Sequence, residues 1–154
     1  APNLEIIGDG EDEIMLKKYK KEHLLQNITF LGKLTYKKVQ KKIEKSKLLI
    51  IPSEWYEPFG LVIIEALSKG TPVASSDIGS LPDLIRTYRH GFLFKTKNEH
   101  SLFKKVKKAW EDKSYLKKLS YYAGKTDKLY TNLNDYQELM TIYNKVIKNN
   151  KVKN

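Results

Sequence analysis

The sequence contains no cysteine. This absence excludes a disulfide framework and any metal site built on thiolates, and it leaves the compartment open. No apolar run approaches the ~20 residues that a helix needs to span a bilayer, and no signal peptide is visible. We therefore expect a cytoplasmic protein, with a weak peripheral contact to an anionic membrane surface as a further option.

Acidic residues are scarce in the second half of the chain. The net charge is +11 over 154 residues, of which residues 1–75 carry +2 and residues 76–154 carry +9. Such a basic half can bind an anionic membrane surface, an anionic polymer or a nucleic acid. We favour lysines spread over solvated helix faces, because no aromatic stacking motif lies among them, and we expect no nucleic acid partner.

Apolar runs and helical patterns alternate along the first 95 residues. The apolar runs predict five strands, at residues 3–7, 27–31, 47–51, 73–75 and 91–94. Four helices are predicted between them. The first begins at residues 11–13, the second spans residues 36–45, the third begins near residues 59–61, and the fourth includes residues 84–85. This alternation predicts an α/β fold with a Rossmann-like parallel sheet flanked by helices. The loops at residues 8–10, 32–35, 52–60 and 76–81 all follow strands, so they belong to the carboxyl edge, where such sheets bind ligands.

The first helix is expected to be amphipathic, with Ile14, Met15, Leu16 and Tyr19 on its apolar side. Its acidic first turn suits the helix dipole. We reject a dinucleotide fingerprint at Gly8 and Gly10, because Glu13 stands where the third glycine would be.

The chain after residue 98 is predicted to be helical. The apolar positions recur at helical spacing and are expected to face the core; they are Leu102, Phe103, Val106, Ala109 and Trp110, then Leu116, Leu119, Tyr122 and Ala123, then Leu139, Ile142, Tyr143, Val146 and Ile147. Asn134 is the expected N-cap of the last helix. The lysines between residues 104 and 108 are either solvated or available to lipid headgroups.

The stretch from Ile51 to Leu67 contains an acidic pair in an unusual place. Glu57 precedes a Pro58-Phe59-Gly60 turn, and Glu65 stands in an otherwise apolar helix that begins near Leu61. Side chains of a helix lean toward its N-terminus, so Glu65 should lie over the first turn. Two carboxylates and the free amides of that turn can then face one crevice, where carboxylates accept hydrogen bonds from hydroxyls and amides suit phosphate. The alternative is that both acids merely favour the positive end of the helix.

This stretch resembles the donor-binding motif of retaining glycosyltransferases of the GT-B fold, particularly glycosyltransferase family four, group 1. The resemblance lies in two glutamates separated by seven residues, Pro-Phe-Gly-Leu after the first, Pro52-Ser53 before it, and Gly70-Thr71-Pro72 after Glu65-Ala66-Leu67. It covers roughly residues 4–95. It implies a nucleotide-sugar-binding domain over residues 1–154.

The resemblance implies a role for each matching residue. Glu57, Phe59, Gly60 and Leu61 would contact the donor sugar and diphosphate; Glu65, Leu34, Gly8 and Gly10 would bind the nucleotide. No metal ligand, no cofactor and no catalytic side chain is implied, since the UDP-, GDP- or ADP-sugar is a co-substrate. The family's domain begins with a further strand–helix unit, so we expect a chain truncated at its N-terminus that also lacks the acceptor domain.

Three functions remain open on the sequence. The first is the donor half of an enzyme that transfers a hexose to a saccharide or lipid-linked acceptor, with the isolated fragment inactive. The second is a non-catalytic basic α/β binding module for anionic polymer or nucleic acid. The third is a related GT-B enzyme such as a nucleotide-sugar epimerase.

Overall fold

We describe a computed structural model of the chain, in which residues 2–125 and 139–147 are placed. The chain divides into two compact units, Ala1–Lys42 and Ile43–Asn154, and each is described by itself. The boundary falls within helix α2, which spans Tyr36–Lys45. No linker therefore separates the two units, and the predicted bounds of this helix are confirmed.

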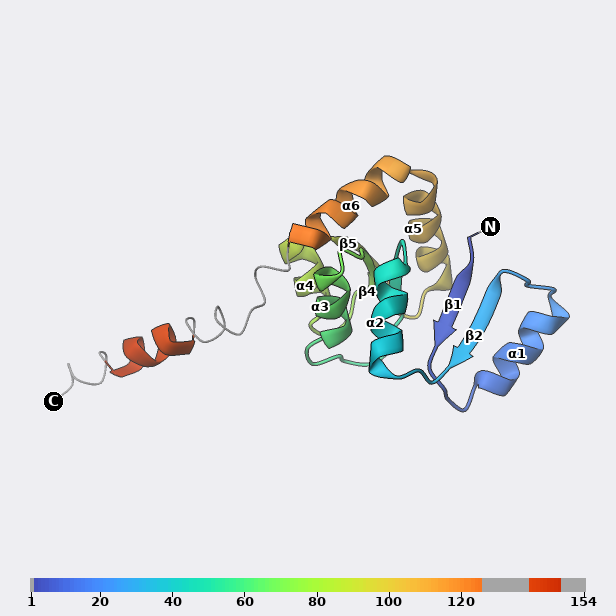
Figure 1. Ribbon diagram of the computed structural model, residues 1–154, viewed down its shortest axis with the longest axis horizontal. Helices are drawn as coiled ribbons and strands as arrows, with labels where there is room; N and C mark the ends of the chain where they lie inside the picture. The colour runs from blue at the N-terminus through green and yellow to red at the C-terminus, as the bar shows by residue number, and fades with distance from the viewer. Residues whose placement is uncertain (1, 126–138, 148–154) are drawn as a thin grey trace. The chain divides into compact units, whose positions relative to one another are not determined.

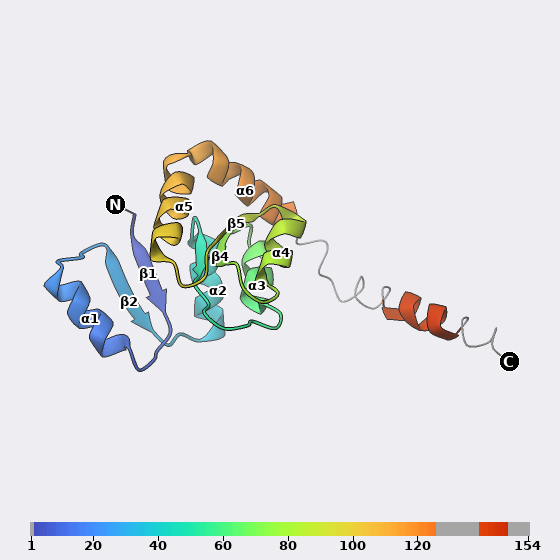
Figure 2. The same cartoon turned by 180° about the vertical axis from the view of Figure 1, so that it is seen from behind.

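The first unit is a β-α-β arrangement. Strands β1 (Leu4–Ile7) and β2 (Ile28–Gly32) pair in parallel, with Leu4 opposite Ile28. Helix α1 (Glu13–Glu22) connects them and runs beside the two-stranded sheet (Figures 1 and 2). Parallel pairing requires such a crossover, because a tight turn can join only antiparallel strands.

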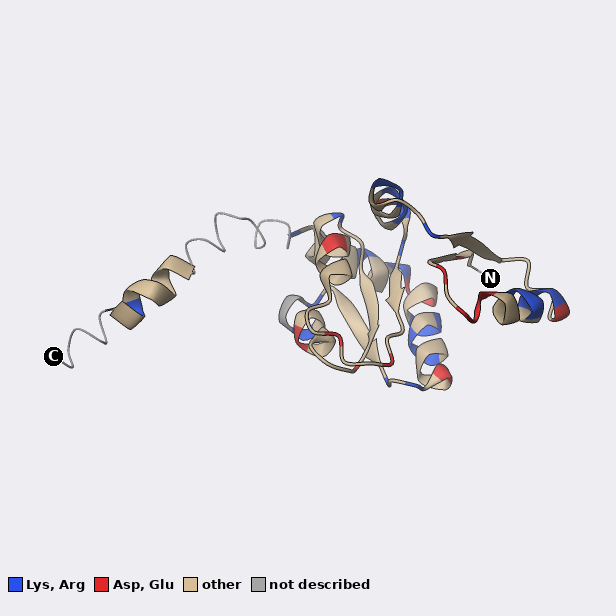
Figure 3. Ribbon diagram, turned by 90° about the horizontal axis from the view of Figure 1, so that it is seen from below, with Lys and Arg blue, Asp and Glu red and all other residues tan. Residues whose placement is uncertain are grey.

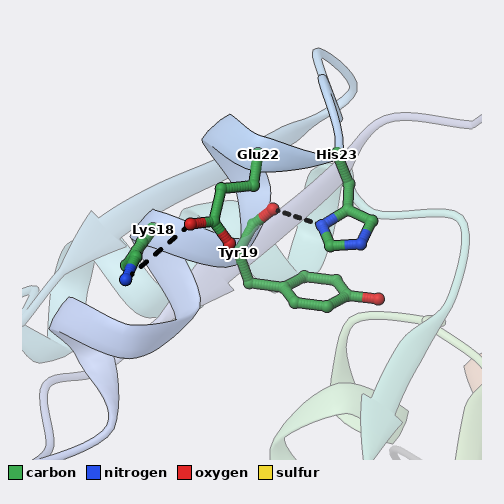
Figure 4. A network of polar contacts seen from close by, with 4 residues as sticks. All are labelled: Lys18, Tyr19, Glu22 and His23. Atoms are coloured by element: carbon green, nitrogen blue, oxygen red, sulfur yellow. Dashed lines mark hydrogen bonds and ion pairs between the residues drawn. The ribbon is translucent and has the colours of Figure 1, made fainter.

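Helix α1 buries none of its residues. The four side chains of its predicted apolar side are all exposed, from 41% for Leu16 to 82% for Ile14. The helix is instead stabilised locally at its C-terminus, where the Nδ1 of His23 lies 3.0 Å from the carbonyl oxygen of Tyr19 and the two rings stack at 3.9 Å (Figure 4). The apolar side of this helix is therefore uncovered, because a pair of short strands offers little surface to cover it.

The second unit is built on a three-stranded parallel sheet in the order β3-β4-β5. Its strands are Leu49–Ile51, Val73–Ser76 and Gly91–Phe94, connected by helices α3 (Leu61–Ser68) and α4 (Leu81–Tyr88) and followed by α5 (Glu99–Glu111) and α6 (Lys113–Lys125). The charged residues of this unit lie on its helices and loops, and its three strands carry none (Figure 3). The predicted α/β fold with parallel strands flanked by helices is thus confirmed, with the strands forming one sheet in each unit.

The core of the second unit surrounds its central strand β4, of which every residue is buried. The fully or almost fully buried apolar side chains come from the strands and all four helices; they include Ile63, Ala66, Leu67, Val73, Ala74, Leu81, Ile85, Phe92, Phe94, Ala109, Leu119 and Ala123. Buried strands of this kind are apolar on both faces. Helices α5 and α6 therefore dock through the predicted positions, except that Phe103 is 63% exposed.

One buried polar contact and one glycine fix details of this core. The hydroxyl of Thr71 donates to the carbonyl of Ile43 at 2.8 Å. Gly91 pairs with Val73 across the sheet, and a Cβ at position 91 would overlap the carbonyl oxygen of Val73. The strands can approach there only because residue 91 is glycine.

Residues 139–147 are helical, as the apolar spacing predicts. The apolar side chains expected to face the core are 47–53% exposed, so this part of the prediction is wrong; they are Leu139, Ile142, Tyr143, Val146 and Ile147. The expected N-cap, Asn134, lies outside the described residues. No helix of the described part of the chain combines the length and apolarity needed to cross a bilayer.

Candidate functional site at the carboxyl edge of the second sheet

The candidate site is built on the chain that leaves strand β3. The strand ends at Ile51, and α3 begins at Leu61 after the loop 52–60. Gly60 is the N-cap and has φ 71° and ψ 45°, a left-handed conformation that favours glycine. A Cβ there would also lie 2.8 Å from a side-chain carbon of Leu81. This turn places the start of α3 where the sequence predicts it, at the carboxyl end of the strand.

Both acids of the predicted pair belong to this loop and helix. Glu57 lies in the loop and Glu65 in the second turn of α3, and both side chains are half-buried. Among the ion pairs of the described residues, neither acid takes part, whereas exposed Glu54 lies 3.8 Å from Lys97. Half-buried carboxylates without a cation keep their oxygens available to accept hydrogen bonds from a ligand.

The loop that carries Glu57 is held by the chain that follows β4. The amide and hydroxyl of Ser80 both donate to the carbonyl of Glu57, at 3.3 and 2.9 Å. The hydroxyl of buried Ser76 lies 2.7 Å from the carbonyl of Ser53 and 3.1 Å from that of Ile51. These serines position the acidic loop, a role that the sequence analysis missed. The signal was available in the polar run that ends an apolar strand, Ser75-Ser76-Asp77.

Asp77 connects the ends of strands β4 and β5. Its carboxylate accepts hydrogen bonds from the amide and the hydroxyl of Thr96, at 2.8 and 2.9 Å. The hydrogen bond from the Thr96 amide, together with that from its hydroxyl, lowers the pKa of Asp77. A carboxylate used in this way ties together the chain segments that leave two neighbouring strands of the sheet.

Apolar side chains around the helix start are left exposed. Phe59 is 53% and Leu61 65% exposed on either side of buried Gly60. The same loop also exposes Trp55 and Tyr56, at 72% and 83%. Exposed aromatic rings beside carboxylates can pack on the apolar faces of sugars or bases, and the sequence analysis did not single out these two.

The other predicted positions lie in the first unit, after strands β1 and β2. Gly8 has φ 127°, and its amide donates to the carbonyl of Gly32 at 3.0 Å. Gly10 accepts a hydrogen bond from the amide of Glu13 at 3.1 Å, and Leu34 is half-buried in the loop before α2. All three occupy the carboxyl edge of their own sheet, as predicted. Their proposed contacts with a nucleotide stay predictions.

The comparisons with known proteins agree with this architecture. The family model described as "Glycosyl transferases group 1" matches residues 1–126. The chain belongs to this family. Among curated proteins, this glycosyl transferase is 32% identical over 83 residues to the glycogen synthase of Mycobacterium tuberculosis, covering 53% of this chain and 20% of that protein. It is 33% identical over 89 residues to the N-acetyl-alpha-D-glucosaminyl L-malate synthase of Bacillus anthracis. The match covers 57% of this chain and 23% of that protein.

Solved structures share the fold. HepE of Anabaena, in complex with UDP, superposes with a TM-score of 0.77 at 20% identity, over 93% of this chain and 41% of that one. The sucrose-phosphate synthase of Thermosynechococcus elongatus gives a TM-score of 0.75 at 21% identity, over 95% of this chain and 39% of that one. The chain thus spans about a fifth of these curated relatives and about two fifths of these structures.

Proposed function

We propose that this chain is the donor-binding half of a retaining glycosyltransferase, which transfers a hexose from a nucleoside diphosphate sugar to a saccharide or lipid-linked acceptor. The observation that carries the proposal is the half-buried pair Glu57 and Glu65 around the glycine-started helix α3. Membership of the group 1 family supports it, as does the UDP in HepE, whose fold is similar.

Each residue of the pair has a distinct part in this proposal. Glu57 accepts hydrogen bonds from hydroxyls of the sugar, and Glu65 accepts them from the ribose. Amides of Gly60 and Leu61 face the diphosphate, because the first turn of a helix carries free N–H groups and a partial positive charge. Phe59 packs beside the sugar.

The proposed reaction breaks the bond between the anomeric carbon and the diphosphate oxygen. A new bond forms to an acceptor hydroxyl, which loses its proton, and the nucleoside diphosphate leaves. Donors fixed in position around the departing phosphate stabilise the negative charge that develops there. The acceptor site would be supplied by a further domain, so we expect the 154-residue chain to bind donor weakly and to turn over little of it.

Titration calorimetry of the chain with UDP-, GDP- and ADP-glucose tests the proposal. Glu65→Gln should weaken binding of both the free nucleoside diphosphate and the sugar nucleotide by at least about tenfold, because one charge-assisted hydrogen bond contributes about 1.5–3 kcal/mol. Glu57→Gln should weaken binding of the sugar nucleotide only. The chain would then no longer prefer the sugar nucleotide over the free nucleoside diphosphate.

Glu54→Gln is the matched control, because it removes the same charge from an exposed position in the same loop. It should leave both affinities within about twofold. Unchanged affinities in the Glu57 and Glu65 variants would reject the assignment. Nucleic-acid binding that falls steeply with salt, without any nucleotide-sugar binding, would favour the basic binding module instead.

A further inference from the structure

A recess lies in the second unit, away from the acidic pair. It has a volume of about 460 Å³ and is lined by residues of α4, β5, α5 and α6. On β5 it contacts Gly91, Phe92 and Leu93, which begin the strand, whereas the candidate donor site follows the carboxyl ends of strands. Neither Glu57 nor Glu65 lines it. Its size falls within the ~300–1,000 Å³ of pockets that hold small organic ligands.

Four cationic side chains surround this recess. Arg86 and Arg89 come from the C-terminal end of α4, Lys105 from α5 and Lys118 from α6. No acidic residue is among the described residues that line it, and none of the four cations enters an ion pair of the described part of the chain. Cations gathered from three helices repel one another unless an anion lies between them. All four side chains are exposed, so their charge is available to an anionic ligand.

The remainder of the lining is apolar or phenolic. Ile85, Phe92 and Leu119 are 3%, 8% and 5% exposed and form its base. Tyr115 contributes a half-buried ring, and burial raises the pKa of its phenol. The hydroxyl can donate a hydrogen bond to a phosphate oxygen. A bare ion would gain nothing from the apolar base, whereas a ligand with an apolar part would be stabilised by covering it.

We propose that this recess, the basic pocket of Arg86, Arg89, Lys105 and Lys118, binds a phosphate ester that carries an apolar group, as an anionic lipid does. Guanidinium forks bind phosphate oxygens in pairs, and lysine ammonium groups add point charge. The apolar portion of the ligand lies on Phe92 and Leu119. The pocket would then hold the chain at an anionic lipid surface independently of its donor site.

Calorimetry with soluble short-chain lipids tests this proposal on the 154-residue chain. Dioctanoyl phosphatidate should bind, and dioctanoyl phosphatidylcholine, which has the same chains and a neutral headgroup, should bind at least about tenfold more weakly. Inorganic phosphate should also bind at least about tenfold more weakly than the phosphatidate, because it lacks the apolar part.

A pair of double variants separates the pocket from the general charge of the helices. Lys105→Gln with Lys118→Gln should weaken phosphatidate binding by about tenfold. Lys104→Gln with Lys117→Gln removes the same charge from adjacent exposed positions outside the pocket, and it should stay within about twofold. Both variants should keep the affinity of the chain for sugar nucleotide, so this test is distinct from that of the donor site.

Each other outcome contradicts the proposal. Equal losses in the two double variants would mean diffuse attraction to the basic surface. Equal affinity for the phosphatidylcholine would mean purely apolar binding, and equal affinity for inorganic phosphate would assign the pocket to a free anion. Absence of phosphatidate binding would reject the proposal outright.

Discussion

The two units of this glycosyl transferase chain use the same local pattern and reach different degrees of burial. Each contains parallel strands connected through helices. Helix α1 of the first unit buries no residue, whereas the eight-residue α3 of the second buries Ile63, Ala66 and Leu67 completely or almost so. The difference lies in the surface available to cover each helix.

This contrast teaches that an amphipathic pattern specifies which side of a helix is apolar, and not whether that side is buried. A pair of parallel strands with one helix has no second layer, whereas three strands between helices enclose a core. We therefore expect the stability of the chain to be concentrated in the second unit. Both tryptophans, Trp55 and Trp110, belong to that unit, so their fluorescence reports on it alone.

The strongest test of the contrast is a matched truncation in the two units. Ile63→Ala should lower the free energy of unfolding by about 3 to 4 kcal/mol, because it opens a cavity at a fully buried position. Ile14→Ala should change it by less than about 0.5 kcal/mol, because this side chain is 82% exposed. Urea unfolding followed by far-UV circular dichroism measures both variants, and tryptophan fluorescence measures the change in the second unit. A large cost for Ile14→Ala would mean that α1 is covered in solution.

The pH dependence of stability provides the second test. His90 of the second unit is fully buried, and desolvation lowers its pKa from 6.5 to about 4. The folded state then favours the neutral ring, so this contribution is complete above about pH 6.5 and is lost as the pH falls toward 4. The total loss is about 3 kcal/mol. The free energy of unfolding, measured with urea at pH 7 and at pH 4.5, should show most of this loss.

The His90→Gln variant should flatten this dependence between pH 7 and 4.5. His100→Gln, at an exposed position of α5, is the control for the loss of a histidine. Protonation of Asp77, whose pKa is lowered, affects stability only at more acidic pH, as the pH falls below about 3.8. A profile that stays steep in the His90 variant would assign the dependence to other groups.

The smallest expected effect concerns the starts of two helices. In the second unit, the Asn98 side chain accepts a hydrogen bond from the amide of Ser101 at 2.7 Å and caps α5. In the first unit, the side chain of Asp12 makes no capping hydrogen bond with α1. Asn98→Ala should therefore cost about 1 kcal/mol and Asp12→Ala less than about half of that. Thermal melts of the two variants measure the difference, and equal costs would contradict it.

Sequence reasoning predicts the elements better than their surroundings. The bounds of α2, the start of α3 at Leu61 and the docking of α6 through Leu119 and Ala123 follow from periodicity and turn residues. These are local properties of the chain. The exposure of Ile14 and Phe103 does not follow, because the same periodicity holds whether or not another layer covers the helix.

The candidate site shows the same division. The acidic pair could be predicted because its spacing and its glycine turn lie within one short stretch. The hydrogen bonds from Ser80 to Glu57 join residues 23 positions apart, and the basic pocket combines four elements. Such groupings depend on tertiary packing, which no local pattern encodes. The polar run that ends at Asp77 was the local signal that the chain after β4 positions other residues of the site.

The absence of a side chain at Gly91 has a consequence for how strand β5 joins the sheet. Sliding β5 by two residues along β4 would bring Arg89 or Leu93 opposite Val73, and either would place a Cβ where the Val73 carbonyl oxygen already lies. The native alignment is thus the one in which this edge strand fits. Misaligned assembly is penalised by steric exclusion, even though Phe92 and Phe94 would offer an apolar face in a neighbouring alignment as well.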